Sequence, residues 1–177
     1  MLVGLLLSGL MVVAGGAEAQ ETEAHLRDAF FRAVGEYFAV PIQEVTIISD
    51  WDLSPDEVPV VLFLSQQGGV SPDALIGVRR GGRPWLQVAG RFGVGPQAFH
   101  LSLPEGGQLG SLTRAYSEFR RRSARDWGQV ELDDSDIVTL VNMRVLSEET
   151  GVPPLQVLRA REREGSFMAA YIRLISP

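Results

Sequence analysis

Residues 58–92 read VPVVLFLSQQGGVSPDALIGVRRGGRPWLQVAGRF, and residues 140–174 read LVNMRVLSEETGVPPLQVLRAREREGSFMAAYIRL. The two stretches align without a gap at a spacing of 82 residues. Their identical pairs are Leu64/Leu146, Ser65/Ser147, Gly69/Gly151, Val70/Val152, Pro72/Pro154, Arg79/Arg161 and Arg91/Arg173. Self-similarity at a fixed spacing is typical of a supersecondary unit that buries its apolar face by docking on a copy of itself. The pattern predicts two equivalent units that share one core.

Each unit contains the motif Gly-Val-x-Pro, at 69–72 and 151–154, and a third copy of the motif lies at 93–96. A glycine after a helix takes the left-handed conformation, and the following apolar residue covers the last turn. Proline then starts the next helix, where its missing N–H is not needed. We therefore expect three helices in each unit, with Trp85 and Phe167 as the aromatic anchors of the two cores.

The rest of the chain predicts further elements. An apolar stripe at helical spacing predicts an amphipathic helix over residues 21–38, which ends before Pro41. The repeat units span about 54–94 and 136–175, and the linker 95–135 carries a helix over 111–122. Residues 44–49 and 98–103 alternate apolar and polar side chains, which predicts a small two-stranded ribbon with His100 exposed on its outer face. The expected fold is mostly α, two trihelical units sharing a core.

The first 19 residues have the pattern of a signal peptide. An almost wholly apolar run over residues 2–13 precedes small residues at Ala17 and Ala19, which predicts cleavage before Gln20. The run is shorter than the roughly 20 residues that a bilayer-spanning helix needs. We therefore expect a periplasmic or secreted protein of about 158 residues, a single helical domain over 20–177 with no transmembrane segment after cleavage.

Most catalytic and metal-binding motifs are missing from the sequence. It has no cysteine, and its two histidines, His25 and His100, stand far apart without a zinc-ligand spacing. The acidic clusters at 50–54 and 133–136 lack the glycine of a calcium-binding loop, and we interpret them as helix caps. No catalytic residue, metal site or cofactor is expected.

A basic and aromatic segment is the best surface candidate. It comprises Arg120, Arg121, Arg122, Arg125 and Trp127, close to Tyr116 and Phe119. Guanidinium groups bind carboxylates and phosphates with two parallel hydrogen bonds, so this segment is a candidate partner-binding surface. The alternative is that these arginines complement a helix end and stay solvated. The same alternative applies to Arg79, Arg80 and Arg83.

Two resemblances bear on function. Residues 64–75 resemble a DNA-binding helix-turn-helix, with the turn at Gly69 and a basic group after it. Export, the net charge of −6, and Glu162 and Glu164 in the second copy speak against nucleic acid. The chain also resembles uncharacterised exported bacterial proteins. The matching residues are Tyr37-Phe38-x-Val40-Pro41 with Glu44-Val45, Val58-Pro59-Val60-Val61, Gly82-x-x-Trp85, Asp136-Ile137-Val138-x-Leu140-Val141-Asn142 and Pro153-Pro154.

That second resemblance implies export and a shared fold, and it implies no site. The function expected from the sequence is therefore a non-catalytic protein-binding or scaffolding role in the cell envelope, with another envelope protein as the partner. An enzyme of unrecognised class is one alternative. A helix-turn-helix nucleic-acid binder is the other, and it requires that the leader is not a true signal peptide.

Overall fold

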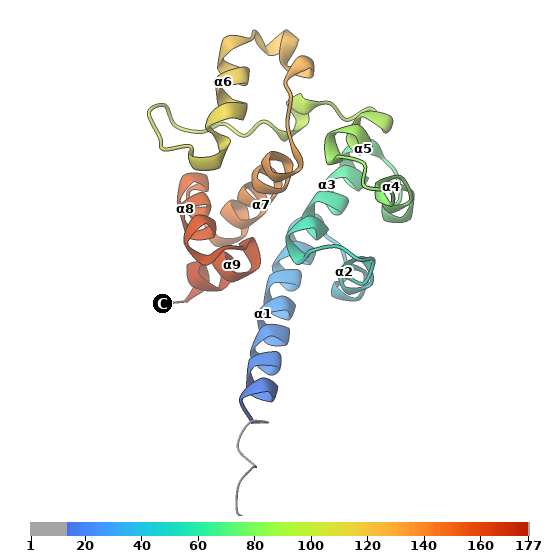
Figure 1. The fold of residues 1–177 in the computed structure, drawn as a ribbon, viewed down its shortest axis with the longest axis vertical. Coiled ribbons are helices and arrows are strands. Elements are labelled where there is room, and N and C mark those ends of the chain that lie inside the picture. The colour runs from blue at the N-terminus through green and yellow to red at the C-terminus, as the bar shows by residue number, and fades with distance from the viewer. Residues whose placement is uncertain (1–13, 177) are drawn as a thin grey trace, which may run out of the picture.

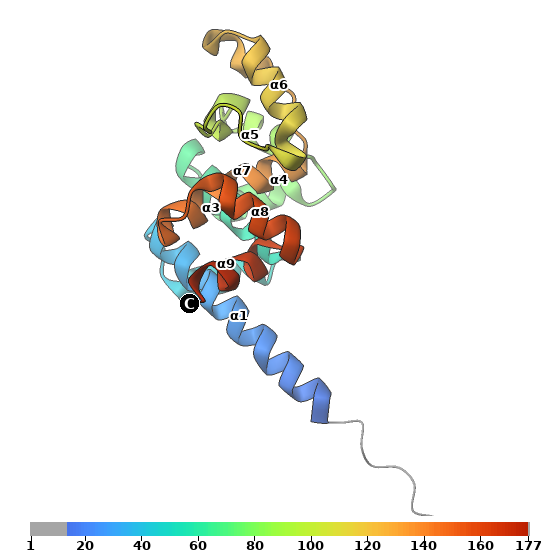
Figure 2. The same cartoon turned by 90° about the vertical axis from the view of Figure 1, so that its left-hand side faces the viewer.

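The computed structural model describes residues 14–176, and these residues are mostly helical with no β-strand among them. Of the predicted leader, residues 1–19, the first 13 lie outside the described residues. Figures 1 and 2 show helices stacked around α3 and α7, with the N-terminal part of α1 projecting from the body. The predicted fold class, mostly α, is confirmed.

Helix α1, Ala14–Phe38, contains the predicted amphipathic helix. Its apolar stripe enters the core through Phe30, Phe31, Val34 and Phe38, which are at most 2% exposed. The helix ends where Ala39 adopts a positive φ of 54° ahead of Pro41. The short helix α2, Ile42–Ser49, then packs against α1 and α3.

The predicted ribbon is wrong. Residues 44–49 belong to helix α2, and residues 96–99 form a 3₁₀-helix, η2 (Pro96–Phe99), without a strand partner. Pro41 precedes the first turn of α2, and Val45 and Ile48 are buried at helical spacing while Ile47 is 55% exposed. The alternation of apolar residues that suggested a strand is therefore a by-product of a helix with one buried face. His100, expected on the outer face, is instead half-buried.

The two matched stretches each fold into three helices. The first consists of α3 (Val58–Gly68), α4 (Pro72–Arg79) and α5 (Trp85–Arg91), and the 3₁₀-helix η1 (Pro55–Glu57) precedes it. The second has α7 (Asp134–Thr150), α8 (Pro154–Glu164) and α9 (Phe167–Ile175). Helices α3 and α7 contact each other, and Trp85 and Phe167 are at most 1% exposed, as predicted for the anchors.

Equivalent positions of the two units carry the same local geometry. Gly69 and Gly151 end α3 and α7 in the left-handed region, with φ of 62° and 69°. The hydroxyl of Ser65 donates to the carbonyl of Val70 at 2.6 Å, and that of Ser147 donates to the carbonyl of Val152 at the same distance. The serine thus binds a carbonyl in the turn that follows the helix. These matches support the repeat, and a close superposition of 58–92 on 140–174 remains its test.

The units are also tied by reciprocal caps. The carboxylate of Asp56, in front of α3, accepts hydrogen bonds from the backbone N–H groups of Phe167 and Met168 at the start of α9, at 2.9 and 3.1 Å. In the other direction, the carboxylate of Asp134 at the start of α7 accepts from the N–H of Trp85 at 2.6 Å. Each unit therefore supplies an anion to the positive N-terminus of the last helix of the other.

The linker forms a lobe at the end of the molecule opposite the projecting part of α1 (Figures 1 and 2). It contains η2, η3 (Gly110–Leu112), α6 (Thr113–Arg121) and η4 (Ala124–Gln129). The predicted helix over 111–122 is confirmed. Buried residues of the lobe belong to the same hydrophobic cluster as those of α1 and both units.

The left-handed glycines give a stability prediction. We expect Gly69→Val and Gly151→Val each to lower the free energy of unfolding by about 1–2 kcal/mol, because a Cβ is strained at positive φ. An added Cβ meets nothing within 4 Å at either glycine, so the cost comes from the backbone alone. Urea denaturation measures it. Gly77→Ala is the matched control, since this residue of α4 also has open space and lacks the positive φ, and it should not destabilise.

Candidate functional site

The candidate surface is built on helix α6. Its buried face consists of Ala115, Tyr116 and Phe119, while Arg120 and Arg121 of its last turn are exposed. The hydroxyl of Tyr116 donates to the carbonyl of Leu101 at 2.5 Å, which holds the segment after η2 against the helix. Burial raises the pKa of Tyr116 to about 12, so its phenol stays protonated and remains a donor. Helix α6 is thereby held in place, and it positions the residues that follow it.

The 3₁₀-helix η4 folds back on the end of α6. Ser123 precedes η4, and its hydroxyl donates to the carboxylate of Asp126 at 2.7 Å. The indole Nε1 of Trp127 donates to the carbonyl of Phe119 at 3.0 Å, which adds to the hydrogen bond that the N–H of Arg122 donates to the same carbonyl at the end of α6. Trp127 is therefore held by a hydrogen bond while part of its ring stays accessible.

His100 completes an aromatic cluster with three rings of this lobe. Its ring centre lies 4.1 Å from that of Trp127, with 30° between the planes, and 4.9 Å from that of Phe119. Tyr116 follows at 5.7 Å. His100 was not among the partner-binding residues predicted from the sequence, because no periodicity links a residue of the loop after η2 to α6 and η4.

Arg144 of α7 holds the backbone of His100, because its guanidinium donates to the carbonyls of His100 and Ala98 at 2.9 and 3.3 Å. Burial lowers the pKa of His100, and the positive charge of Arg144 lowers it further. The imidazole is thus favoured in its neutral form, in which it packs against Trp127 as an aromatic ring.

The pKa of His100 gives a pH prediction. The unfolded chain binds a proton at His100 near the ordinary value of 6.5, and the folded chain does so only at lower pH. The contribution of His100 to stability is therefore present above pH 6.5 and is lost as the pH falls from there towards the folded pKa. We expect His100→Phe, which keeps a ring and removes the titration, to lose less stability than the wild type between pH 7 and 5. Denaturant midpoints measure it, and parallel curves for the two proteins would contradict it.

The five predicted surface residues divide into two groups. Arg121 and Arg122 both form ion pairs with Glu118 one turn earlier, so their charge is partly satisfied within α6. The structure gives Arg120 and Arg125 no ion pair among the described residues, and both side chains are exposed. We call Arg120, Arg125, Trp127 and His100 the arginine–aromatic surface.

A small cavity opens on this surface. Its volume is about 230 Å³, and His100, Tyr116, Phe119 and Trp127 supply its rings, with Arg120 and Glu105 as its charged groups. Such a cavity can take an apolar side chain of a partner against the rings while a carboxylate meets the guanidinium of Arg120.

The acidic cluster at 133–136 caps the start of a helix, as the sequence indicated, whereas in the cluster at 50–54 only Ser54 does so. Ser54 with Glu57, and Asp133 with Asp136, form capping boxes at η1 and α7. Arg114 adds ion pairs to both carboxylates of the second box. Asp50 and Asp52 differ, since both are exposed and neither caps the start of a helix. The described residues contain no group of acidic or histidine side chains that would hold a metal ion.

Arg79, the first basic residue of the helix-turn-helix pattern, has a role inside the protein. Its guanidinium binds the carboxylates of Glu57 and Asp134 at 2.9 and 2.8 Å and lies 4.6 Å from the ring centre of Trp85. It is thus engaged by the core rather than available to phosphates. Arg80, Arg83 and His25 are exposed.

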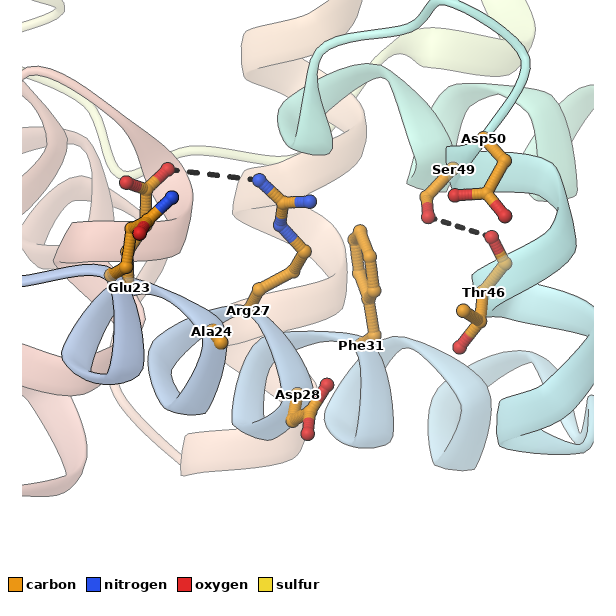
Figure 3. A pocket seen from close by; sticks show the side chains of 9 residues that line it. Glu23, Ala24, Arg27, Asp28, Phe31, Thr46, Ser49 and Asp50 are labelled. Atoms are coloured by element: carbon orange, nitrogen blue, oxygen red, sulfur yellow. Dashed lines mark hydrogen bonds and ion pairs between the residues drawn. The ribbon is translucent and has the colours of Figure 1, made fainter. Parts of the chain in front are cut away.

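Another cavity, of about 620 Å³, lies elsewhere, between α1 and α2. Figure 3 shows Phe31 standing between Arg27 of α1 and Thr46 of α2. Glu23 pairs with Arg27 at 3.6 Å, and the hydroxyl of Ser49 donates to the carbonyl of Thr46 at 2.7 Å. The polar groups along this cavity are therefore partly satisfied by near neighbours in sequence, and the cavity brings together no recognisable set of reacting groups.

No helix within residues 14–176 is long and apolar enough to cross a bilayer. Comparisons of the chain with models of protein families, with curated proteins and with solved structures find no match, so the function has to be argued from the arginine–aromatic surface itself.

Proposed function

We propose that this chain is an exported cell-envelope protein that binds another protein without catalysing a reaction, and that the arginine–aromatic surface is where it binds. One observation carries the proposal. Trp127 is anchored at 3.0 Å to the end of α6 and stacked on His100, and Arg120 lines the same cavity. Arg125 precedes Trp127 by two residues, and both arginines are exposed without ion pairs among the described residues. Tryptophan, tyrosine and arginine are the residue types that contribute most to binding energy at protein interfaces.

The rigidity of this surface supports a binding role. Association is weakened when side chains must be ordered, and a ring already fixed by a hydrogen bond and by stacking avoids that cost. The neighbouring guanidinium groups favour a partner that presents carboxylates around an apolar side chain, since charge complementarity speeds association and selects the partner. The predicted signal peptide and the resemblance to exported bacterial proteins support an envelope location for such a partner.

Site-specific photocrosslinking tests the surface. A photoreactive amino acid in place of Arg125 should link the protein to one defined envelope protein, whereas the same residue in place of Arg83, an exposed arginine of the first unit, should not. Trp127→Ala should lower the yield from position 125 about tenfold or more, as expected for a central aromatic contact. Equal crosslinking from both positions would contradict the proposal.

Two further measurements separate the alternatives. The mass of the protein purified from the envelope fraction should correspond to a chain that begins at Gln20. An intact leader and a cytosolic location would instead favour the nucleic-acid alternative. A small-molecule turnover that is lost in the His100→Phe protein while its fold is retained would favour an enzyme.

A further inference from the structure

A second charged site lies in the second repeat unit, between α8 and α9. A cavity of about 320 Å³ is lined by three arginines, Arg159 and Arg163 of α8 and Arg173 of α9. Its apolar lining comes from Ala160 and Leu174, and Gln156 adds an amide. This site is separate from the arginine–aromatic surface on α6 and η4.

The charges of this cavity are not neutralised within the described part of the protein. Glu164 is the one carboxylate in its lining, and no ion pair within 4.0 Å joins it to any of the three arginines. The Nε of Arg163 donates to the carbonyl of Arg159 at 3.3 Å, which leaves the terminal nitrogens of its guanidinium without a described partner. Arg159 and Arg163 are four residues apart on α8, and like charges at this spacing destabilise a helix. An anion bound between them would relieve this repulsion, which adds to its binding free energy.

The repeat supplies an internal comparison. Arg79 and its equivalent Arg161 are present in both units, and each lies over the aromatic anchor of its unit, at 4.6 Å from Trp85 and 5.9 Å from Phe167. These arginines therefore serve packing. Arg159 and Arg163, in contrast, align with Gly77 and Gly81 of the first unit. The three-helix arrangement thus forms without a guanidinium at either position. Arg173 has Arg91 as its equivalent, so the second unit differs from the first by the pair Arg159 and Arg163.

We propose that this cavity binds a small ligand through a phosphate-type oxyanion of charge −2 or more. Guanidinium groups bind such oxyanions through paired, charge-assisted hydrogen bonds, and three of them around one cavity suit a doubly charged group better than a single carboxylate. The oxyanion is carried either by a soluble phosphate ester or by a phosphomonoester lipid headgroup, because both present the same chemistry to the arginines.

Titration calorimetry with pyrophosphate in about 0.15 M salt tests the site, since screening at that ionic strength weakens exposed and diffuse charge effects. The wild type should bind pyrophosphate saturably at one site. Arg159→Gln combined with Arg163→Gln should weaken binding at least about tenfold, because hydrogen bonds from both guanidinium groups are lost. The matched control removes two exposed arginines of the first unit, Arg83→Gln with Arg91→Gln, and should change the affinity less than about twofold.

Flotation with phosphatidylcholine vesicles that contain phosphatidic acid distinguishes the two sources. Vesicle binding that depends on Arg159 and Arg163 assigns a lipid headgroup, and pyrophosphate binding without flotation assigns a soluble ester. No saturable binding of pyrophosphate by the wild type, or equal weakening in the control pair, would overturn the proposal. Crosslinking from Arg125 is unaffected by either result, so this site and the proposed function fail independently.

Discussion

Trp85→Ala is expected to lower the free energy of unfolding by about 3–5 kcal/mol, the range found when a large aromatic side chain is removed from a core. Trp85 is fully buried at the start of α5. Folded domains are commonly stable by only about 5–15 kcal/mol, so a loss of this size should unfold a large share of the protein at a modest urea concentration.

Part of the destabilisation by Trp85→Ala comes from the loss of polar interactions. The indole Nε1 of Trp85 donates to the carboxylate of Glu57 at 3.0 Å, and the guanidinium of Arg79 lies over the ring. Glu57 has a lowered pKa because hydrogen bonds from Ser54, Arg79 and Trp85 together outweigh the opposing effect of its burial. Alanine removes one of these donors and leaves a cavity beside a charged pair.

Urea denaturation followed by circular dichroism measures the effect of Trp85→Ala. Trp127→Ala is the matched control, because it removes the same side chain from a half-buried position in the lobe. Its cost should be clearly smaller than that of Trp85→Ala. If the two substitutions cost the same, Trp85 is not the anchor of the first unit.

The sequence predicted those features of the fold that depend on near neighbours. Gly69 and Gly151 were recognised as helix ends, and the structure has both in the left-handed region. Such ends require specific residue types at fixed positions, so a single phrase is informative. Residues 44–49 were assigned wrongly because Val45 and Ile47 fit an alternating pattern, whereas Val45 and Ile48 fit a helix as well. In so short a segment, the spacing of two residues expected for a strand and the spacing of three expected for a helix differ by only one position.

The candidate sites were only partly predictable, because their members meet in space and not along the chain. Arg120, Arg125 and Trp127 are close in sequence and were found from composition. His100 comes from a separate loop and reaches Trp127 only through the packing of that loop against α6 and α7. Arg173 likewise joins Arg159 through the contact between α8 and α9. The reciprocal caps of Asp56 and Asp134 also cross between the two units.

We expect Asp56→Ala to lower the free energy of unfolding by about 2 kcal/mol, the second largest effect among these substitutions. The side chain accepts two backbone hydrogen bonds at the start of α9, and hydrogen bonds of this kind to a charged group contribute about 1.5–3 kcal/mol. Asp56→Asn keeps one acceptor oxygen and should cost less than alanine. Asp73→Ala is the control, since this exposed acidic residue lies in the first turn of α4, and its change should stay within about 0.5 kcal/mol.

The pH dependence adds a second measurement to the same variants. Burial, with a smaller contribution from the charge of Glu57, raises the pKa of Asp56 above 3.8 against the opposing effect of its two hydrogen bonds and of Arg161. A raised carboxyl pKa stabilises the folded state below the unfolded value, and this contribution is lost as the pH rises through the folded pKa. The wild type should therefore gain stability relative to Asp56→Asn as the pH is lowered towards 3.8. If Asp56→Ala is neutral and this difference does not change with pH, the cap from the first unit does not hold α9.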